Sequence, residues 1–220
     1  SFDAIRQHWP DAKKVTILCG TGNNGGDGYI LARMVKEAKL VAKVIQLGDH
    51  GKLKGDALRS YQEWEKAGGS SSGFSSDAFQ ESDLIVDALL GTGLEREVTG
   101  EWGQAIEAMN ASGLPVFSID IPSGLHADTG AVMGVAVHAE LTISFIGLKQ
   151  GLFTGKAADY CGQILFNDLQ VPQEIYAGVE PSAFRIDHEL LARLLPKRAR
   201  TCHKGQCGHV LVIGGDHGMV

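Results

Sequence analysis

VTILCGTGNNGGDGYILARMVKEAKL, at residues 15–40, joins three kinds of local sequence pattern. Residues 15–20 are apolar, rich in β-branched side chains and end in glycine, which is typical of a buried strand. Residues 29–40 carry apolar side chains at helical spacing, so we expect a helix there. The intervening residues 21–28 are expected to form a Gly-rich loop. Strand, Gly-rich loop and helix in this order are typical of α/β nucleotide-binding proteins.

Similar patterns recur on both sides of this stretch. Further strands are expected at 41–49, 83–91, 114–120, 139–147 and 162–168, and further helices at 2–9, 54–69, 102–112 and 187–195. Strands that alternate with helices predict an α/β fold with a Rossmann-like, doubly wound, mainly parallel sheet and helices on both faces. Ligands of such sheets bind beyond the carboxyl ends of the strands. The Gly-rich and acidic motifs of this sequence follow the predicted strands, so we expect the site at that edge.

Composition and charge exclude several classes of protein. The 220 residues have a formal net charge of -6, so the chain lacks the basic footprint of a nucleic-acid-binding protein. No apolar run approaches the length of a membrane span, so no membrane association is expected. The four cysteines, Cys19, Cys161, Cys202 and Cys207, look like reduced thiols and favour a cytoplasmic location. A zinc site at Cys202, His203, Cys207 and His209 is disfavoured because no second ligand cluster accompanies it.

The C-terminal part of the chain has a different character from the rest. Residues 169–200 contain three prolines and a basic run at 197–200, which we interpret as solvated linker surface. HVLVIGGDHGM at 209–219 looks like a new strand followed by a Gly-rich loop. We therefore expect a second domain to begin there. Because the first residue is Ser1 rather than methionine, we also expect the natural chain to start upstream.

The first candidate site is the Gly-rich loop. Gly20–Gly25 matches G-x-G-x-x-G, whose glycines let backbone N–H groups approach an anion at a helix N-terminus. Together with Asp49 after the next strand, this match also fits an NAD-dependent dehydrogenase. Asn23, Asn24 and Asp27 instead place amides and a carboxylate where a pyrophosphate loop keeps small neutral residues. These three side chains either bind a ligand or merely cap the turn.

Two further strand ends carry acidic residues. Asp87 lies within an apolar strand, where an unpaired carboxylate would be costly, so it needs hydrogen-bond donors or a cation. Gly91–Gly93 can cradle phosphate oxygens and Arg96 can pair with them, although Arg96 could equally be an ordinary surface residue. Asp120 ends another strand and is a candidate acid/base, or else an Asx-turn residue.

Four motifs together resemble a known family. They are GTGNNGGDG at 20–28, DALLGTGL at 87–94, IDIPSGL at 119–125 and TISFIGLKQG at 142–151. In this order and spacing they resemble the NAD(P)H-hydrate epimerase domain, also called the YjeF N-terminal domain. The resemblance assigns residues 1–175 to that domain, without the family's helix upstream of Phe2, and residues 176–202 to a linker. Residues 203–220 resemble the truncated start of a ribokinase-like, ADP-dependent NAD(P)H-hydrate dehydratase domain, as in bacterial bifunctional repair enzymes.

The resemblance implies a reaction and a set of site residues. The substrates would be NADHX and NADPHX, nicotinamide nucleotides hydrated at C6, whose R and S forms the domain epimerises. The implied substrate contacts are Asn23, Asn24, Gly25, Gly26, Asp27, Gly91, Thr92, Gly93, Leu94, Glu95, Arg96, Glu97 and Asp120. The implied ligands of a potassium ion are Asn24, Asp87 and Ser123, which offer hard oxygen atoms.

Asp120 is our candidate acid/base, and Lys149 its helper. ADP would serve only the dehydratase domain. The family also implies a homodimer. A different outcome remains open, because relatives of this domain include non-catalytic nucleotide-binding dimerisation modules. Retention of Asn24, Asp87, Asp120 and Ser123 together favours the enzyme.

Overall fold

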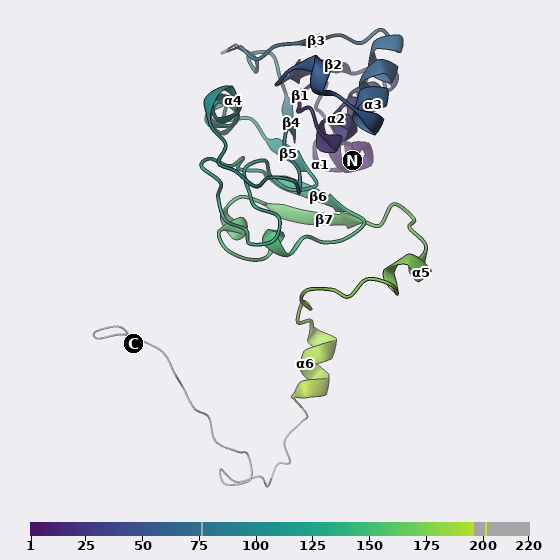
Figure 1. The fold of residues 1–220 in the computed structure, drawn as a ribbon, viewed down its shortest axis with the longest axis vertical. Helices are drawn as coiled ribbons and strands as arrows, with labels where there is room; N and C mark the ends of the chain where they lie inside the picture. Colours follow the sequence, from purple (N-terminus) through teal and green to yellow (C-terminus); the bar gives the residue numbers. More distant parts are fainter. Residues whose placement is uncertain (76, 196–200, 202–220) are drawn as a thin grey trace, which may run out of the picture. The chain divides into compact units, whose positions relative to one another are not determined.

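The computed structural model describes residues 1–75, 77–195 and 201 (Figure 1). The chain divides into two compact units, Ser1–Glu180 and Pro181–Val220. The first unit contains the whole sheet, and the described part of the second contains the helix α6 (His188–Leu194). The expectations for residues 197–200, for the cysteine–histidine group at 202–209 and for the start of another domain lie outside the described residues.

A parallel sheet of seven strands organises the first unit. The strands are β1 (Lys14–Cys19), β2 (Val41–Gln46), β3 (Ser71–Ser72), β4 (Leu84–Ala88), β5 (Val116–Ile119), β6 (Leu141–Phe145) and β7 (Gln163–Asn167). Their order is β3-β2-β1-β4-β5-β6-β7, and every pairing is parallel. The predicted α/β fold is therefore confirmed. Among the described residues the sheet is entirely, rather than mainly, parallel.

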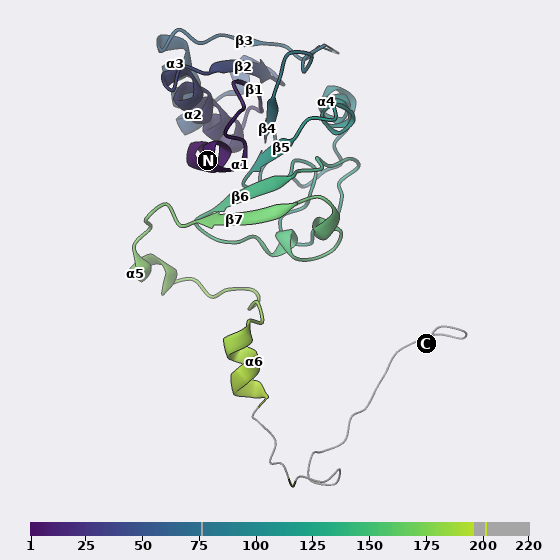
Figure 2. The same cartoon turned by 180° about the vertical axis from the view of Figure 1, so that it is seen from behind.

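Helices cover both faces of the sheet. The α-helices of the first unit are α1 (Phe2–His8), α2 (Asn23–Glu37), α3 (Gly55–Lys66), α4 (Gly100–Ala111) and α5 (Gln173–Tyr176); three short 3-10 helices are η1 (His50–Lys52), η2 (Gln150–Leu152) and η3 (Ala157–Asp159). Figures 1 and 2 show α1, α2 and α3 on one side of the sheet and α4 on the other. The 3-10 helices η2 and η3 lie in the connection between β6 and β7.

The core consists of one layer on each side of the central strands. In β1, the side chains of Ile17 and Cys19 join the cluster beneath α1, α2 and α3, whereas Leu18 joins the cluster beneath α4. All five residues of β4 are buried, because both of its faces are covered. Strands covered on both faces read as continuous apolar runs, which is why the central strands were predictable from sequence.

Two differences from the sequence expectations concern local structure. The helix expected at 29–40 begins at Asn23, so most of the expected loop at 21–28 is the first part of α2. Gly25 is buried there, and a Cβ added to it would lie 2.0 Å from the carbonyl oxygen of Gly20. No strand was expected at Ser71 and Ser72, but these residues pair with β2 and form β3.

Candidate active site

A cavity of about 540 Å³ lies at the carboxyl ends of β1, β4 and β5. The start of α2, the loop after β4 and the residue after β5 form its walls. The lining residues are Thr21, Gly22, Asn23, Asn24, Asp27, Leu89, Leu90, Gly91, Thr92, Gly93, Leu94, Glu95, Arg96, Trp102 and Asp120. We call this the polar cavity. Its position matches the strand edge at which the sequence places the site.

Three of the five predicted substrate contacts from the first motif line the polar cavity. Asn23, Asn24 and Asp27 face it from the first turns of α2. Gly25 and Gly26 are buried and are not among the lining residues. A Cβ on Gly26 would come within 3.0 Å of the Cα atom of Ala57 in α3. The two glycines therefore let α2 approach its neighbours closely.

The loop after β4 supplies the second wall. Residues 91–96 all line the polar cavity, and Glu97 lines an adjoining cavity of about 390 Å³. Trp102 of α4 lines both cavities, and sequence reasoning did not single it out. Its ring lies beside Gly48 and Thr21, residues distant in sequence, so no local pattern could indicate its place.

Asp87 is fully buried and hydrogen-bonded to neighbouring loops. Its Oδ1 accepts from the Ser123 hydroxyl at 2.5 Å and from the Leu89 N–H at 3.2 Å. Its Oδ2 accepts from the Ser123 N–H at 2.8 Å and from the Ser118 hydroxyl at 2.9 Å. Burial raises the pKa of Asp87, and the hydrogen bonds from Ser123 and Ser118 oppose the rise. The required donors therefore exist.

Asn24 and Ser123 meet at the backbone of Leu90. The Asn24 side-chain amide donates to the Leu90 carbonyl at 3.0 Å, and the Leu90 N–H donates to the Ser123 hydroxyl at 2.8 Å. Asn24, Ser123 and Asp87 thus belong to one hydrogen-bonded network. The Oδ1 atom of Asn24 is buried and has no hydrogen-bond partner among the described residues. The described residues hold no group of three or more His, Cys, Asp or Glu that could hold a metal ion.

Asp120 and Lys149 form an ion pair at the edge of the polar cavity. Asp120 follows β5 and has a φ of 70°, in the left-handed region that few residues other than glycine adopt. The Lys149 ammonium also donates to the Ser144 hydroxyl at 3.2 Å and to the Phe145 carbonyl at 3.0 Å. Both side chains of the ion pair are only 18% exposed. The pair is therefore held in place but remains accessible.

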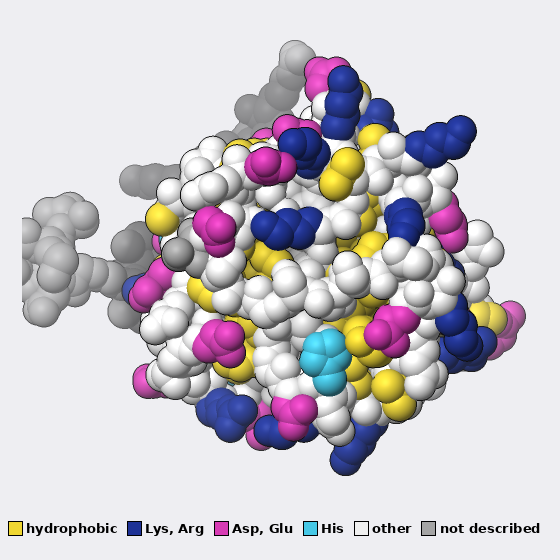
Figure 3. All heavy atoms as spheres, turned by 90° about the horizontal axis from the view of Figure 1, so that it is seen from above, with side chains coloured by type: hydrophobic (Ala, Val, Ile, Leu, Met, Phe, Trp, Pro, Cys, Tyr) yellow, Lys and Arg dark blue, Asp and Glu magenta, His cyan; other side chains and the backbone are white. Residues whose placement is uncertain are grey.

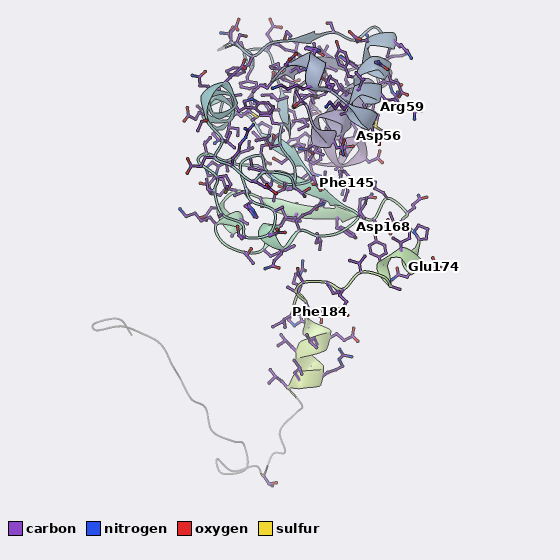
Figure 4. The ribbon with its side chains drawn as sticks, in the orientation of Figure 1. Asp56, Arg59, Phe145, Asp168, Glu174 and Phe184 are labelled. Atoms are coloured by element: carbon purple, nitrogen blue, oxygen red, sulfur yellow. The ribbon has the colours of Figure 1, made fainter. Side chains whose placement is uncertain are left out.

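A second, more apolar cavity of about 710 Å³ adjoins the first. It is lined by Ser1, Asp27, Ile30, Leu31, Met34, Thr92, Asp120, Phe145, Ile146, Gly147, Lys149 and Leu169. Phe145, labelled in Figure 4, is the last residue of β6. Asp27, Thr92 and Asp120 line both this apolar cavity and the polar cavity. These three residues mark the junction of the two cavities.

The electrostatic setting of Asp27 differs from that of an ordinary surface carboxylate. Its side chain is accessible from the cavities, yet the protein atoms around it partly exclude water. This desolvation raises the pKa of Asp27 to about 6; the negative charge of Asp120 adds to the rise, and Lys149 opposes it. A carboxyl group with such a pKa can carry a proton near neutral pH.

Asp49 does not take the position of a ribose-binding acid. It precedes η1, and its carboxylate accepts a hydrogen bond from the Gly51 N–H at 2.9 Å. It lines neither the polar nor the apolar cavity. The geometry thus gives no support to a dehydrogenase.

On the face that Figure 3 shows, acidic and basic side chains are interspersed rather than gathered into one basic surface.

Comparison with known proteins gives the family. The family described as YjeF-related protein N-terminus matches residues 1–151. The chain belongs to this family. It is 42% identical over 219 residues to the bifunctional NAD(P)H-hydrate repair enzyme Nnr of Coxiella burnetii, covering 100% of this chain and 45% of that protein. It is also 42% identical to the Escherichia coli K12 enzyme of the same name, covering 99% of this chain and 42% of that protein.

A shorter family member aligns over most of its own length. The NAD(P)H-hydrate epimerase of Limosilactobacillus fermentum is 36% identical over 171 residues, which are 76% of this chain and 79% of that protein. The crystal structure of yeast YNL200c shares the fold, with a TM-score of 0.67 and 18% identity, covering 84% of this chain and 82% of that chain. The chain spans less than half the length of the two bifunctional relatives. No helix among the described residues is long and apolar enough to cross a membrane.

Proposed function

We propose that the chain is an isomerase that interconverts the R and S epimers of hydrated NADH and NADPH. The observation that carries this proposal is that residues from all four motifs line one pair of adjoining cavities. Family membership supports it, as does similarity to an NAD(P)H-hydrate epimerase across most of that protein. The cavities meet at Asp27 and Asp120, so titratable groups lie where a bound dinucleotide would pass.

The walls of the polar cavity suit the phosphate part of a dinucleotide. Gly91 and Gly93 let backbone N–H groups come close to phosphate oxygens, and Arg96 supplies a positive charge for them. The apolar cavity, with Ile30 and Phe145 among its walls, suits a ring. A dinucleotide needs both kinds of compartment, and the described residues place them side by side.

The reaction requires a proton to be delivered and later removed. C6 of the hydrate carries both a ring nitrogen and a hydroxyl group. Its configuration is lost through an iminium formed by loss of the hydroxyl, or through ring opening to an aldehyde. Asp120 performs acid/base chemistry in either route, and Lys149 holds its carboxylate in position.

The network around Asp87 fits a potassium ion. In the part of the chain that the structure describes, the buried Oδ1 atom of Asn24 lacks a hydrogen-bond partner. Asp87 is a buried carboxyl group whose hydrogen-bond partners in that part are all uncharged. Together with the Ser123 hydroxyl they offer oxygen ligands of the kind hard cations take. When bound there, the ion would supply positive charge that offsets the burial of Asp87. Asn24 would then link this charge to the wall of the polar cavity.

Some parts of the proposal concern the longer protein. Its bifunctional relatives suggest that the full-length protein also carries an ADP-dependent NAD(P)H-hydrate dehydratase, a lyase, beyond the described residues. A homodimer is proposed from the family. Cys19 and Cys161 are buried free thiols, which suits the cytoplasm. A non-catalytic nucleotide-binding dimerisation module is the second candidate, but it would not need the Asp120–Lys149 pair.

A coupled assay tests the proposal. Racemic NADHX is mixed with an S-specific dehydratase and its nucleotide, with and without this chain, in potassium chloride or in choline chloride. We expect the R fraction to be consumed faster with the chain, and faster still with potassium. If the R fraction is consumed no faster with the chain than without it, the epimerase is rejected and the binding module is favoured.

A further inference from the structure

Two aspartates face the junction of the cavities from different elements. Asp27 comes from the start of α2, and Asp120 from the end of β5. Both line the polar and the apolar cavity, and of the other described residues only Thr92 does so. A dinucleotide whose ring lies in the apolar cavity and whose phosphates lie in the polar cavity has to pass both carboxyl groups.

The surroundings of the two aspartates differ. Asp120 is ion-paired with Lys149, whose ammonium group holds the carboxylate at the junction. Among the described residues, no ion pair or hydrogen bond involves the Asp27 side chain, and it faces the negative charge of Asp120. Desolvation and that charge raise the pKa of Asp27 to about 6 although Lys149 opposes the rise, so its acid form persists closer to neutral pH.

We propose that Asp27 is a second catalytic residue, the acid that protonates the departing hydroxyl group, while Asp120 acts as the base. This inference rests on the proposed epimerase function. It gives Asp27 a chemical task beyond substrate contact, and it divides the proton transfers between two groups. Enzymes commonly place two carboxyl groups in different surroundings to obtain one acid and one base.

The proton balance closes over one turnover. Asp27 gives its proton to the C6 hydroxyl; the C6–O bond breaks, its electron pair leaves with the oxygen as water, and the N1 lone pair forms the C6=N1 bond. Water then adds to the other face of C6, the C6=N1 electron pair returns to N1, and Asp120 accepts the proton from the added water. A water molecule at the junction carries this proton from Asp120 back to Asp27. The reverse epimerisation uses the same groups with their roles exchanged: Asp120 gives its proton to the hydroxyl that leaves, and Asp27 accepts a proton from the water that adds.

Replacement of Asp27 tests the inference in the full 220-residue chain. We expect Asp27→Asn to lower kcat for epimerisation about 10²–10⁴-fold. The Kd for NADPH, which lacks the reacting hydroxyl, should stay close to the wild-type value. In the wild type, kcat/KM should fall as pH rises through about 6, where Asp27 loses its proton. The Asn variant should lack this fall, and Asp27→Glu should recover part of the rate.

Asp56→Asn serves as the matched control. Asp56 is an exposed aspartate in the first turn of α3 and lines neither cavity, so this variant should keep the wild-type rate. A near-wild-type rate in Asp27→Asn would overturn the inference while leaving the epimerase intact. Parallel loss of rate and of NADPH affinity would make Asp27 only a binding contact and would also overturn it. A wild-type chain without epimerase activity would reject the proposed function and this inference together.

Discussion

Asp120 combines an unusual backbone conformation with a carboxylate that is both paired and accessible. Its backbone adopts a φ of 70°, its carboxylate is ion-paired with Lys149, and it faces the junction of the cavities. A non-glycine residue in this region costs about 1–3 kcal/mol, which the surrounding structure has to offset. With this backbone conformation, Asp120 lines both cavities.

Asp120→Asn removes the acid/base group and should leave the fold unchanged. Asparagine tolerates the left-handed region about as well as aspartate, so the fold should persist. We expect the rate of R/S interconversion to fall about 10²–10⁴-fold, because the acid/base group is lost. Circular dichroism and the Tm report on the fold, and the coupled assay reports on the rate. Near-normal turnover in this variant would remove Asp120 from the mechanism.

Asp27 should also make stability depend on pH. Its pKa is about 6 in the folded chain against an ordinary value of 3.8, so the folded state binds this proton more tightly than the unfolded state. The resulting stability is fully present below the ordinary pKa and is lost as pH rises through about 6. We therefore predict that Asp27→Asn gains stability relative to the wild type between these two pH values.

Urea unfolding of both proteins across that range measures the difference in free energy of unfolding. The control is Asp56→Asn, which lies in solvent. A pH-independent difference between Asp27→Asn and the wild type would show that Asp27 titrates in the folded chain as it does in the unfolded one.

The need for hydrogen-bond partners could be predicted where a single polar residue stands in an apolar strand. An aspartate inside an apolar strand indicated that Asp87 needs partners, and the structure supplies them. Ser118 was missed as one of them, although a serine inside the apolar strand β5 was a visible signal. Lys149 was expected to assist Asp120 because of the family resemblance, and the structure pairs the two side chains. No local pattern indicated this ion pair, because only the fold brings the two residues together.

At the scale of elements, α2 differs most from its expectation. Glycine lowers helix stability by about 1 kcal/mol relative to alanine, so a stretch with three glycines is typical of a loop. Packing against β1 and α3 compensates for this in the structure, since Gly25 and Gly26 contact backbone that side chains would obstruct. Central strands were predictable because burial on both faces gives long apolar runs, whereas the polar, two-residue β3 has no such signal.

Gly25→Ala tests the close contact between α2 and Gly20, the residue that follows β1. The added methyl group would lie 2.0 Å from the Gly20 carbonyl oxygen, so the helix has to shift. We expect the free energy of unfolding to fall by about 1–3 kcal/mol, measured by urea denaturation. Gly22→Ala is the matched control, because no atom of the described residues, apart from its own and those of its two chain neighbours, lies within 4 Å of its added Cβ. Equal effects of the two substitutions would contradict the packing argument.

At the scale of the whole molecule, the site lies within one compact unit. All residues of the two cavities belong to Ser1–Glu180. We therefore predict that a chain ending at Glu180 unfolds cooperatively and epimerises NADHX at the rate of the 220-residue chain. Urea unfolding and the coupled assay check this. Loss of activity with an intact fold would show that Pro181–Val220 contributes to the site.

The most direct test of the central claim follows one pure epimer without a coupling enzyme. Purified R-NADHX is incubated with the chain in potassium chloride, and the two epimers are separated by chromatography at successive times. The proposed chemistry predicts that S-NADHX accumulates to equilibrium faster with protein than without it, and that Asp120→Asn removes most of this difference. Accumulation of S-NADHX at the same rate with and without protein would contradict the claim that the junction of the two cavities is an epimerase site.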